Sequence, residues 1–291
     1  MNYLINQPIC VKPKNRGRPI TWHPRLLMLL FVLIASGCAT VPHTGRRQLN
    51  VVSDGQLNAL AIKAFNEVVS KEPESKDQAF NQIVRRVTTR VSKAAEATDK
   101  PRFEWEVRAI DKDVPNAVCL PGGKILVFTG LRPYLGNEAG LAAVIAHEVA
   151  HAVARHGAER LSQQLAMRGA MSVSGEVLKN KDGSLDAKSR ILLGALGLGG
   201  TLGVVLPYSR VHEFEADRIG LIYMARAGYD PSEAVRLWER MSKIKKPPIP
   251  AWLSTHPADE ERITKLRELL PEAEKLYREA SPKYGFGVAL R

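Results

Sequence analysis

Two histidines and a glutamate in the middle of the chain have the spacing of a metal-dependent hydrolase. His147 and His151 stand four residues apart in an apolar stretch with helical spacing, so both imidazoles project from one helix face and can reach a single ion. Zinc binds neutral histidine nitrogens and, in catalytic sites, leaves one position open for water. Glu148 can reach such a water and act as the general base. The sequence therefore predicts a catalytic site for one Zn²⁺ per chain.

A third protein ligand is expected from a later helix. No histidine follows His151 in the H-x-x-G-x-x-H pattern, and His156 is expected on the opposite helix face, as a structural or surface residue. Glu213 and Asp217 lie four residues apart on a separate helical stretch. Glu213 is predicted to bind the metal and Asp217 to orient a ligating histidine, whereas Glu215 is expected to point away.

The elements that must position these residues are mostly helices. Apolar residues at helical spacing predict helices over four stretches: 54–72, 76–96, 138–168 and 209–227. Gly228 is expected to end the last of these, and Asp230-Pro231-Ser232-Glu233 to begin another helix. A final helical stretch is expected from about Pro257 towards Ala280.

A small sheet is expected beside these helices. Residues 103–109 alternate between apolar and charged side chains, which indicates a half-buried strand. Two β-prone runs flank Gly122-Gly123 and predict a hairpin, and Pro121 places the first run at a sheet edge because proline donates no ladder hydrogen bond. The predicted fold is mainly α with a small β-sheet (α+β), with the active-site helix packed beneath the sheet. Segment 174–190 is expected to be a loop, and 191–206 either a buried segment or a mobile flap.

The N-terminus has the composition of a targeting segment. Residues 1–25 carry five cations and no acid, and an apolar run from Leu26 to Ala35 precedes Cys38. This resembles a bacterial lipoprotein signal, so we expect a signal peptide over 1–37, a lipidated Cys38 with a tether over 38–50, and one domain over 51–291. A plain signal peptide and a mitochondrial presequence are the alternatives. The net charge of +12 comes without an RNA-binding motif or a phosphate loop, so no nucleic-acid partner is expected.

The motifs together resemble the gluzincin pattern of one metallopeptidase family, that of the CAAX prenyl protease, HtpX and Oma-type peptidases. The wider similarity comprises Asn116-Ala117 with Pro121-Gly122-Gly123, Arg155-His156, Glu159-Arg160, Ser209-Arg210, His256-Pro257 and Arg262-Ile263. In layout the chain looks most like the bacterial periplasmic lipoproteins of the BepA and LoiP kind, without their helical-repeat tail.

The resemblance implies a site and a substrate class. It implies that an edge strand formed by Asn116, Ala117, Val118, Cys119 and Leu120 pairs with the substrate backbone, which suits the edge position inferred from Pro121. It also implies that His256 and Arg262 lie over the active site, where His256 either fills the open metal position in a resting state or stabilises the oxyanion. The implied activity is hydrolysis of internal peptide bonds in unfolded or misassembled cell-envelope proteins.

The sequence thus predicts a zinc endopeptidase of protein quality control. The expected location is the periplasmic face of a Gram-negative outer membrane, with a lipid anchor on Cys38 and outer-membrane assembly partners. One rival is an envelope chaperone or assembly factor with a latent or structural zinc site, which would be closed by four protein ligands. A mitochondrial membrane protease of the Oma type is a third possibility.

Overall fold

A three-stranded mixed sheet lies at the centre of the unit that begins at Cys38. The computed structural model describes residues 38–167, 209–244, 251–257, 260–286 and 289–290. The strands are β3 (Glu106–Ile110), β4 (Ala117–Leu120) and β5 (Lys124–Phe128). The predicted signal peptide and the segments 174–190 and 191–206 lie outside the described residues.

The order of the strands is β3-β5-β4, with β5 parallel to β3 and antiparallel to β4. β4 and β5 form the predicted hairpin, in which Leu120 pairs with Lys124. The turn between them contains Gly122 and Gly123 at φ +79° and +86°, where a Cβ would be strained. β4 lies at one edge of this sheet, as Pro121 indicates.

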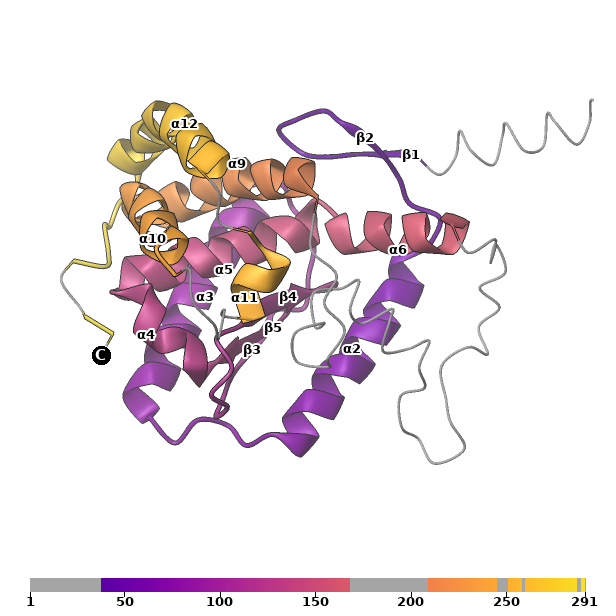
Figure 1. Ribbon diagram of the computed structural model, residues 1–291, viewed down its shortest axis with the longest axis horizontal. Helices are drawn as coiled ribbons and strands as arrows, with labels where there is room; N and C mark the ends of the chain where they lie inside the picture. The colour runs from indigo at the N-terminus through magenta and orange to yellow at the C-terminus, as the bar shows by residue number, and fades with distance from the viewer. Residues whose placement is uncertain (1–37, 168–208, 245–250, 258–259, 287–288, 291) are drawn as a thin grey trace, which may run out of the picture. The chain divides into compact units, whose positions relative to one another are not determined.

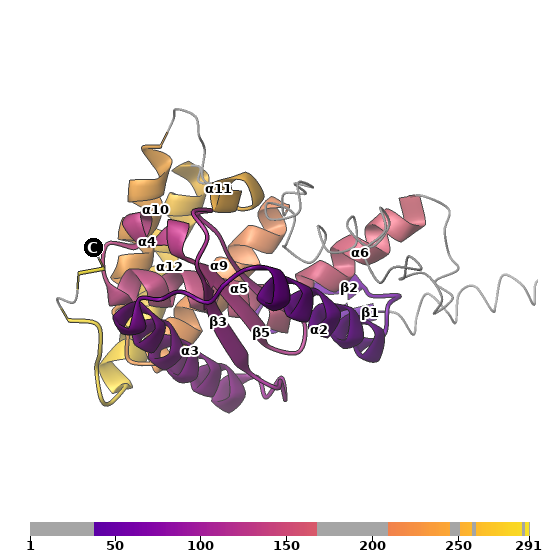
Figure 2. The ribbon, with the colours of Figure 1, turned by 90° about the horizontal axis from the view of Figure 1, so that it is seen from below.

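Helices cover both faces of the sheet, as Figures 1 and 2 show. On one face, α2 (Asp54–Lys71) buries Leu57 and Phe65 against Val118 and Leu120 of β4. On the other face, the core contains Ala117 and Cys119 of β4 together with α3 (Gln78–Thr98) and α5 (Glu138–Val153). All four residues of β4 are therefore buried, even though the strand is at an edge.

The active-site helix α5 is central to the fold. All its residues except Val153 are buried, and Asn137 caps it by accepting a hydrogen bond from the Gly140 N–H at 2.9 Å. α9 (Arg210–Arg226) packs along α5 and is itself capped by Ser209. The remaining helices are η1 (Thr129–Leu131), α4 (Arg132–Leu135), α6 (His156–Met167), α10 (Ser232–Ser242), α11 (Ala251–Thr255) and α12 (Glu260–Glu279). The predicted fold class is confirmed.

The helix predicted over 138–168 is in fact two helices. α5 ends at Val153, and α6 begins at His156 in a new direction. Arg155 between them has φ 60°, which ends an α-helix and changes the direction of the chain. Arginine seldom adopts this conformation, so composition gave no sign of the break. The strand predicted over 103–109 is observed as β3, shifted to Glu106–Ile110.

Residues 38–49, expected as a tether, form a hairpin of β1 (Cys38–Thr40) and β2 (Arg47–Leu49). Its turn contains His43 and Gly45 at φ 60° and 70°. The amide of Gln48 donates to the Ala154 carbonyl at 2.8 Å, which ties the hairpin to the turn after α5. Among the helices of the described residues, none has both the length and the apolar character needed to cross a bilayer.

Candidate metal centre

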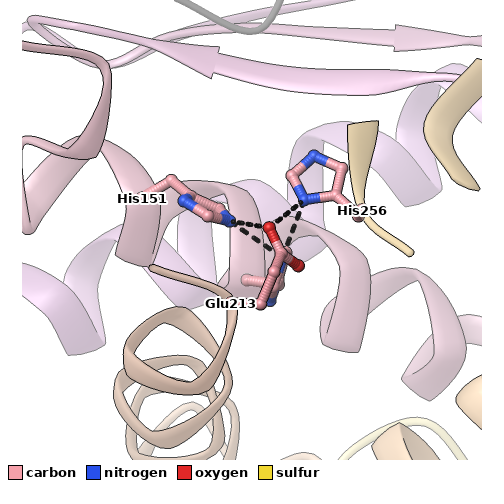
Figure 3. Close-up of side chains that lie close together, drawn as sticks. His151, Glu213 and His256 are labelled. Carbon is pink, nitrogen blue, oxygen red and sulfur yellow. Dashed lines mark hydrogen bonds and ion pairs between the residues drawn. The ribbon is translucent and has the colours of Figure 1, made fainter. Parts of the chain in front are cut away.

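Four buried side chains from three parts of the chain meet at one point. His147 and His151 come from α5, Glu213 from the first turn of α9, and His256 follows α11. One ligand atom from each lies within 4.8 Å of all the others. Figure 3 shows His151, Glu213 and His256 converging from their separate elements.

The spacing of these atoms suits a zinc ion. Zinc bonds to nitrogen and carboxylate oxygen of about 2.0–2.2 Å place the corners of a tetrahedron about 3.3–3.6 Å apart. His147 Nε2 lies 3.0 Å from His151 Nε2, 3.2 Å from His256 Nδ1 and 3.4 Å from a Glu213 oxygen. Glu213 Oε1 lies 3.4 Å from His151 Nε2 and 3.0 Å from His256 Nδ1. The donor set therefore fits the metal that the motif predicts.

Burial and neighbouring charges shift the pKa values of the clustered side chains. Burial would raise the pKa of Glu213, but the charge of Arg262 holds it well below its usual range. Burial lowers the pKa of His151 well below its usual value, so this imidazole is neutral, as a ligand must be. Burial and Arg262 lower the pKa of His147, yet hydrogen bonds with Asp217 and Glu213 outweigh them and raise it to about 9.

Asp217 and Arg262 lie beside the ring of His147. The Asp217 carboxylate lies 3.0 Å from His147 Nδ1, the nitrogen turned away from the metal cluster. Arg262 from α12 donates to both oxygens of Asp217, at 2.6 and 2.7 Å, and its guanidinium lies 3.5 Å above the Trp238 ring. Asp217 thus lies where the sequence predicted it. Arg262 lies beside the metal ligands and is fully buried.

His151 is supported by a residue whose position the sequence analysis placed wrongly. Because the chain turns at Arg155, His156 packs against His151, and its Nδ1 lies 2.9 Å from His151 Nδ1. His156 is completely buried, and its Nε2 lies 3.1 Å from Glu215. Burial lowers the pKa of His156 to about 4. Glu215, expected to point away, is buried in this second network.

Glu148 lies beside the metal ligands with its carboxylate already engaged. The indole N–H of Trp252 in α11 donates to Glu148 Oε1 at 2.7 Å, and His256 Nε2 lies 3.4 Å from the same oxygen. Trp252 stacks on Trp238 with ring centroids 4.7 Å apart. The segment containing α11 and His256 therefore contacts the predicted base and supplies the fourth member of the candidate ligand set.

The predicted substrate strand lies next to this centre. Ala117 to Leu120 form β4, and Asn116, just before it, accepts a hydrogen bond from the Phe128 N–H through its carbonyl. A cavity of about 280 Å³ is lined by Cys119, Pro121 and Gly122 of the hairpin and by His151. Strand edge, cavity and metal ligands are thus contiguous.

Comparison with known proteins places these features in a family. The model of "Peptidase family M48" matches residues 78–270, a range that includes all three predicted metal ligands. The chain is 36% identical over 246 residues to the mitochondrial metalloendopeptidase OMA1 of Schizosaccharomyces pombe, covering 84% of this chain and 69% of that protein. The match to OMA1 of Arabidopsis thaliana is 36% identical and covers 76% of this chain and 44% of that protein.

A bacterial relative matches at lower identity. The beta-barrel assembly-enhancing protease of Escherichia coli is 27% identical over 241 residues, covering 80% of this chain and 47% of that protein. The chain spans about half the length of several of these relatives. The matches confirm the metallopeptidase resemblance that the motifs indicated.

The predicted outer-membrane location is contradicted by these relatives. Proteins named mitochondrial from fungi, a plant and animals match most of the chain, which points to mitochondria and not to a Gram-negative outer membrane. The error has a physical origin, because a basic, acid-free N-terminus is common to secretory signals and mitochondrial presequences. Lipidation of Cys38 stays a prediction.

Proposed function

The chain belongs to peptidase family M48 and is a zinc metallopeptidase, and we propose that it hydrolyses internal peptide bonds of unfolded or misassembled proteins. The observation that supports this proposal most directly is the position of Glu148 beside His147, His151 and Glu213. When bound, zinc supplies a Lewis acid that polarises the scissile carbonyl and lowers the pKa of water. The metal ligands proposed are His147, His151 and Glu213.

Glu148 is the proposed general base. It takes a proton from the attacking water and returns it to the leaving amine. Its place directly after His147 on α5 holds the carboxylate next to the ligands. Asp217 is proposed to fix the ring of His147 through Nδ1, and Arg262 to fix Asp217.

Substrate is proposed to bind as an added strand at β4. An unpaired edge offers backbone N–H and C=O groups to any extended segment, so affinity does not depend on sequence. The cavity beside Cys119 and His151 can take one substrate side chain. Only extended segments can pair in this way, which favours unfolded or misassembled proteins over folded ones. We do not propose that the substrates come from a bacterial cell envelope, because the relatives contradict the outer-membrane location on which that prediction depended.

The second candidate is an assembly factor with a latent zinc site, and a specific observation favours it. His256 completes a set of four ligands, and Trp252 engages Glu148, so the described arrangement is closed. We propose that this closure is a resting state of the peptidase and that His256 leaves the metal when substrate binds. A permanent fourth ligand would instead make the site structural.

The test is cleavage of casein by the full chain loaded with zinc. Glu148→Gln is expected to lower the rate by at least about 10²-fold while zinc content is unchanged, because only the base is lost. Glu272→Gln, an exposed carboxylate on α12, is the matched control and should cleave like the wild type. Zinc bound by the wild type without any cleavage, even in His256→Ala, would reject the peptidase in favour of the assembly factor.

A further inference from the structure

A network of buried polar side chains connects the N-terminal hairpin to a metal ligand. It contains Arg46 of the β1–β2 turn, Glu159 and His156 of α6, and His212 and Glu215 of α9. The two glutamates and two histidines are buried, and the Arg46 side chain is 27% exposed. No part of this network was expected from the sequence, and the proposed reaction does not use it.

The network reaches the metal centre through one nitrogen. His151 turns Nε2 towards the other ligands, so a metal at the site requires that Nδ1 carry the proton. That N–H has an acceptor 2.9 Å away, the Nδ1 of His156. His156 must then carry its own proton on Nε2, where it donates to Glu215 Oε2 at 3.1 Å. The orientation of His151 is therefore set by Glu215 through His156.

Glu215 is held in turn by the hairpin. Its Oε1 accepts from the Thr44 hydroxyl at 2.8 Å and from Arg46 Nε at 2.9 Å, and its Oε2 accepts from Arg46 Nη2 at 2.9 Å. With His156, this makes four donors for one carboxylate, which is the full number it can accept. Neither oxygen can move without breaking a charge-assisted bond.

Arg46 also binds a second carboxylate, that of Glu159. Its Nη1 and Nη2 also donate to Glu159, at 2.9 and 2.7 Å, so the planar guanidinium bridges α6 and α9. Lysine cannot reproduce this fork, since an ammonium group is a single point of charge. His212 Nε2 lies 2.9 Å from Glu159 and its ring stacks on His156, which completes the support.

We infer that Arg46 is a positioning residue for the zinc ligand His151, acting through Glu215 and His156, so that docking of the β1–β2 hairpin completes the metal site. The inference rests on the proposed metal ligands. It gives residues 38–49 a role in the peptidase centre itself.

The experiment measures the zinc Kd of the full chain by competition with a chromogenic chelator and the absorption spectrum of the Co²⁺ form. Arg46→Ala is expected to raise the zinc Kd about 10- to 100-fold, the usual effect of losing a partner behind a ligating histidine, and to shift the Co²⁺ bands. Arg46→Lys should fail to restore the wild-type Kd. Arg47→Ala, an exposed arginine in the next position, removes the same charge and should leave Kd and spectrum unchanged.

The readouts separate positioning from simple stabilisation. Arg86→Ala breaks an ion pair with Glu138 away from the metal and should lower the unfolding temperature without changing the zinc Kd. Arg46→Ala with the wild-type Kd and Co²⁺ spectrum overturns the inference, whatever its stability. If Arg46→Ala does not fold, Thr44→Val is the deciding variant, because it removes only one donor to Glu215. A wild-type Co²⁺ spectrum in Thr44→Val would also overturn the inference. A wild type that binds no zinc would refute the proposed ligands themselves.

Discussion

At the scale of single residues, the hydrogen bonds of the proposed base Glu148 bear most directly on the proposed reaction. The indole N–H of Trp252 donates to Glu148 Oε1 at 2.7 Å and so occupies an oxygen that an attacking water would approach. We therefore expect the indole to leave Glu148 during turnover. Trp252 is also held by its backbone N–H, which donates to the Pro115 carbonyl next to β4 at 2.9 Å. A substrate that adds to β4 arrives beside this anchor.

Replacing Trp252 by phenylalanine isolates the hydrogen bond. Trp252→Phe retains a ring to stack on Trp238 but has no N–H for Glu148, so the base is freer. We expect kcat for casein cleavage to rise by up to about tenfold, since hydrogen bonds to charged groups contribute roughly 1.5–3 kcal/mol. Trp105→Phe is the control, because it loses an indole N–H donated to Glu96 instead. An unchanged kcat with full zinc content would show that the indole does not restrain the base.

At the scale of elements, the site depends on how closely α5 and α9 approach. A Cβ built on Gly220 of α9 would lie 3.1 Å from the His147 amide nitrogen and 3.2 Å from the Ala146 carbonyl carbon. The two backbones are therefore nearly in contact at this crossing. Glu213, about two turns earlier on α9, reaches the histidines of α5 because of this approach.

Gly220→Ala is expected to move α9 away from α5. The added methyl meets backbone atoms, which cannot rotate aside, so the helices separate and Glu213 retreats from His147 and His151. We expect zinc affinity to fall by about tenfold and the unfolding free energy by about 1–3 kcal/mol. Gly55→Ala in the exposed first turn of α2, where nothing lies within 4 Å, should instead be neutral or slightly stabilising. Unchanged zinc affinity in Gly220→Ala, by chelator competition, would contradict this account.

The elements also show what sequence patterns can predict. The helices bearing His147, His151, Glu213 and Asp217 were predicted, because apolar periodicity and four-residue spacing are local properties. The turn at Arg155 was not, since it depends on an arginine in the left-handed region whose side chain pairs with Asp54 of α2. That one turn moved His156 from the far side of a long helix onto His151.

The hairpin over 38–49 was missed for a related reason. Its residues are polar turn formers, and its stability comes from Arg46 bonds to Glu159 and Glu215, more than a hundred positions away. No pattern within the segment encodes such partners. The contact of Trp252 with Glu148 spans a similar separation and was likewise beyond local reasoning.

At the scale of the whole molecule, Glu138 joins several parts of the chain. This first residue of α5 accepts from Arg86 and Arg90 of α3 and from the Tyr229 hydroxyl after α9. Burial would raise the pKa of Glu138, but the hydrogen bond from Arg86, the Tyr229 hydroxyl and the arginine charges lower it below 4.5. Its position at the N-terminus of α5 also favours the negative charge.

This lowered pKa makes stability depend on pH with a definite sign. The folded protein holds the Glu138 proton less tightly than the unfolded chain does. Its contribution is therefore complete above 4.5, the unfolded value, and is lost as the pH falls through the lower folded value. Glu138→Gln should cost about 2 kcal/mol of unfolding free energy at pH 7 and less near pH 3.5. Urea titrations of the wild type and Glu138→Gln, both in the presence of a chelator, measure this difference in unfolding free energy. A difference that grows as the pH falls would contradict the prediction.

The burial of α9 has a consequence for the order in which the protein is made. His147 and His256 are 109 positions apart, so at ribosomal rates of about 5–20 residues per second roughly 5–20 s separate them. α9 packs against α12, which follows His256 in the chain. The packing of α9, which also contacts the earlier helix α5, is therefore complete only after the ribosome has passed His256. The segment that closes the metal centre has thus already been synthesised when the helix bearing Glu213 gains its full set of neighbours.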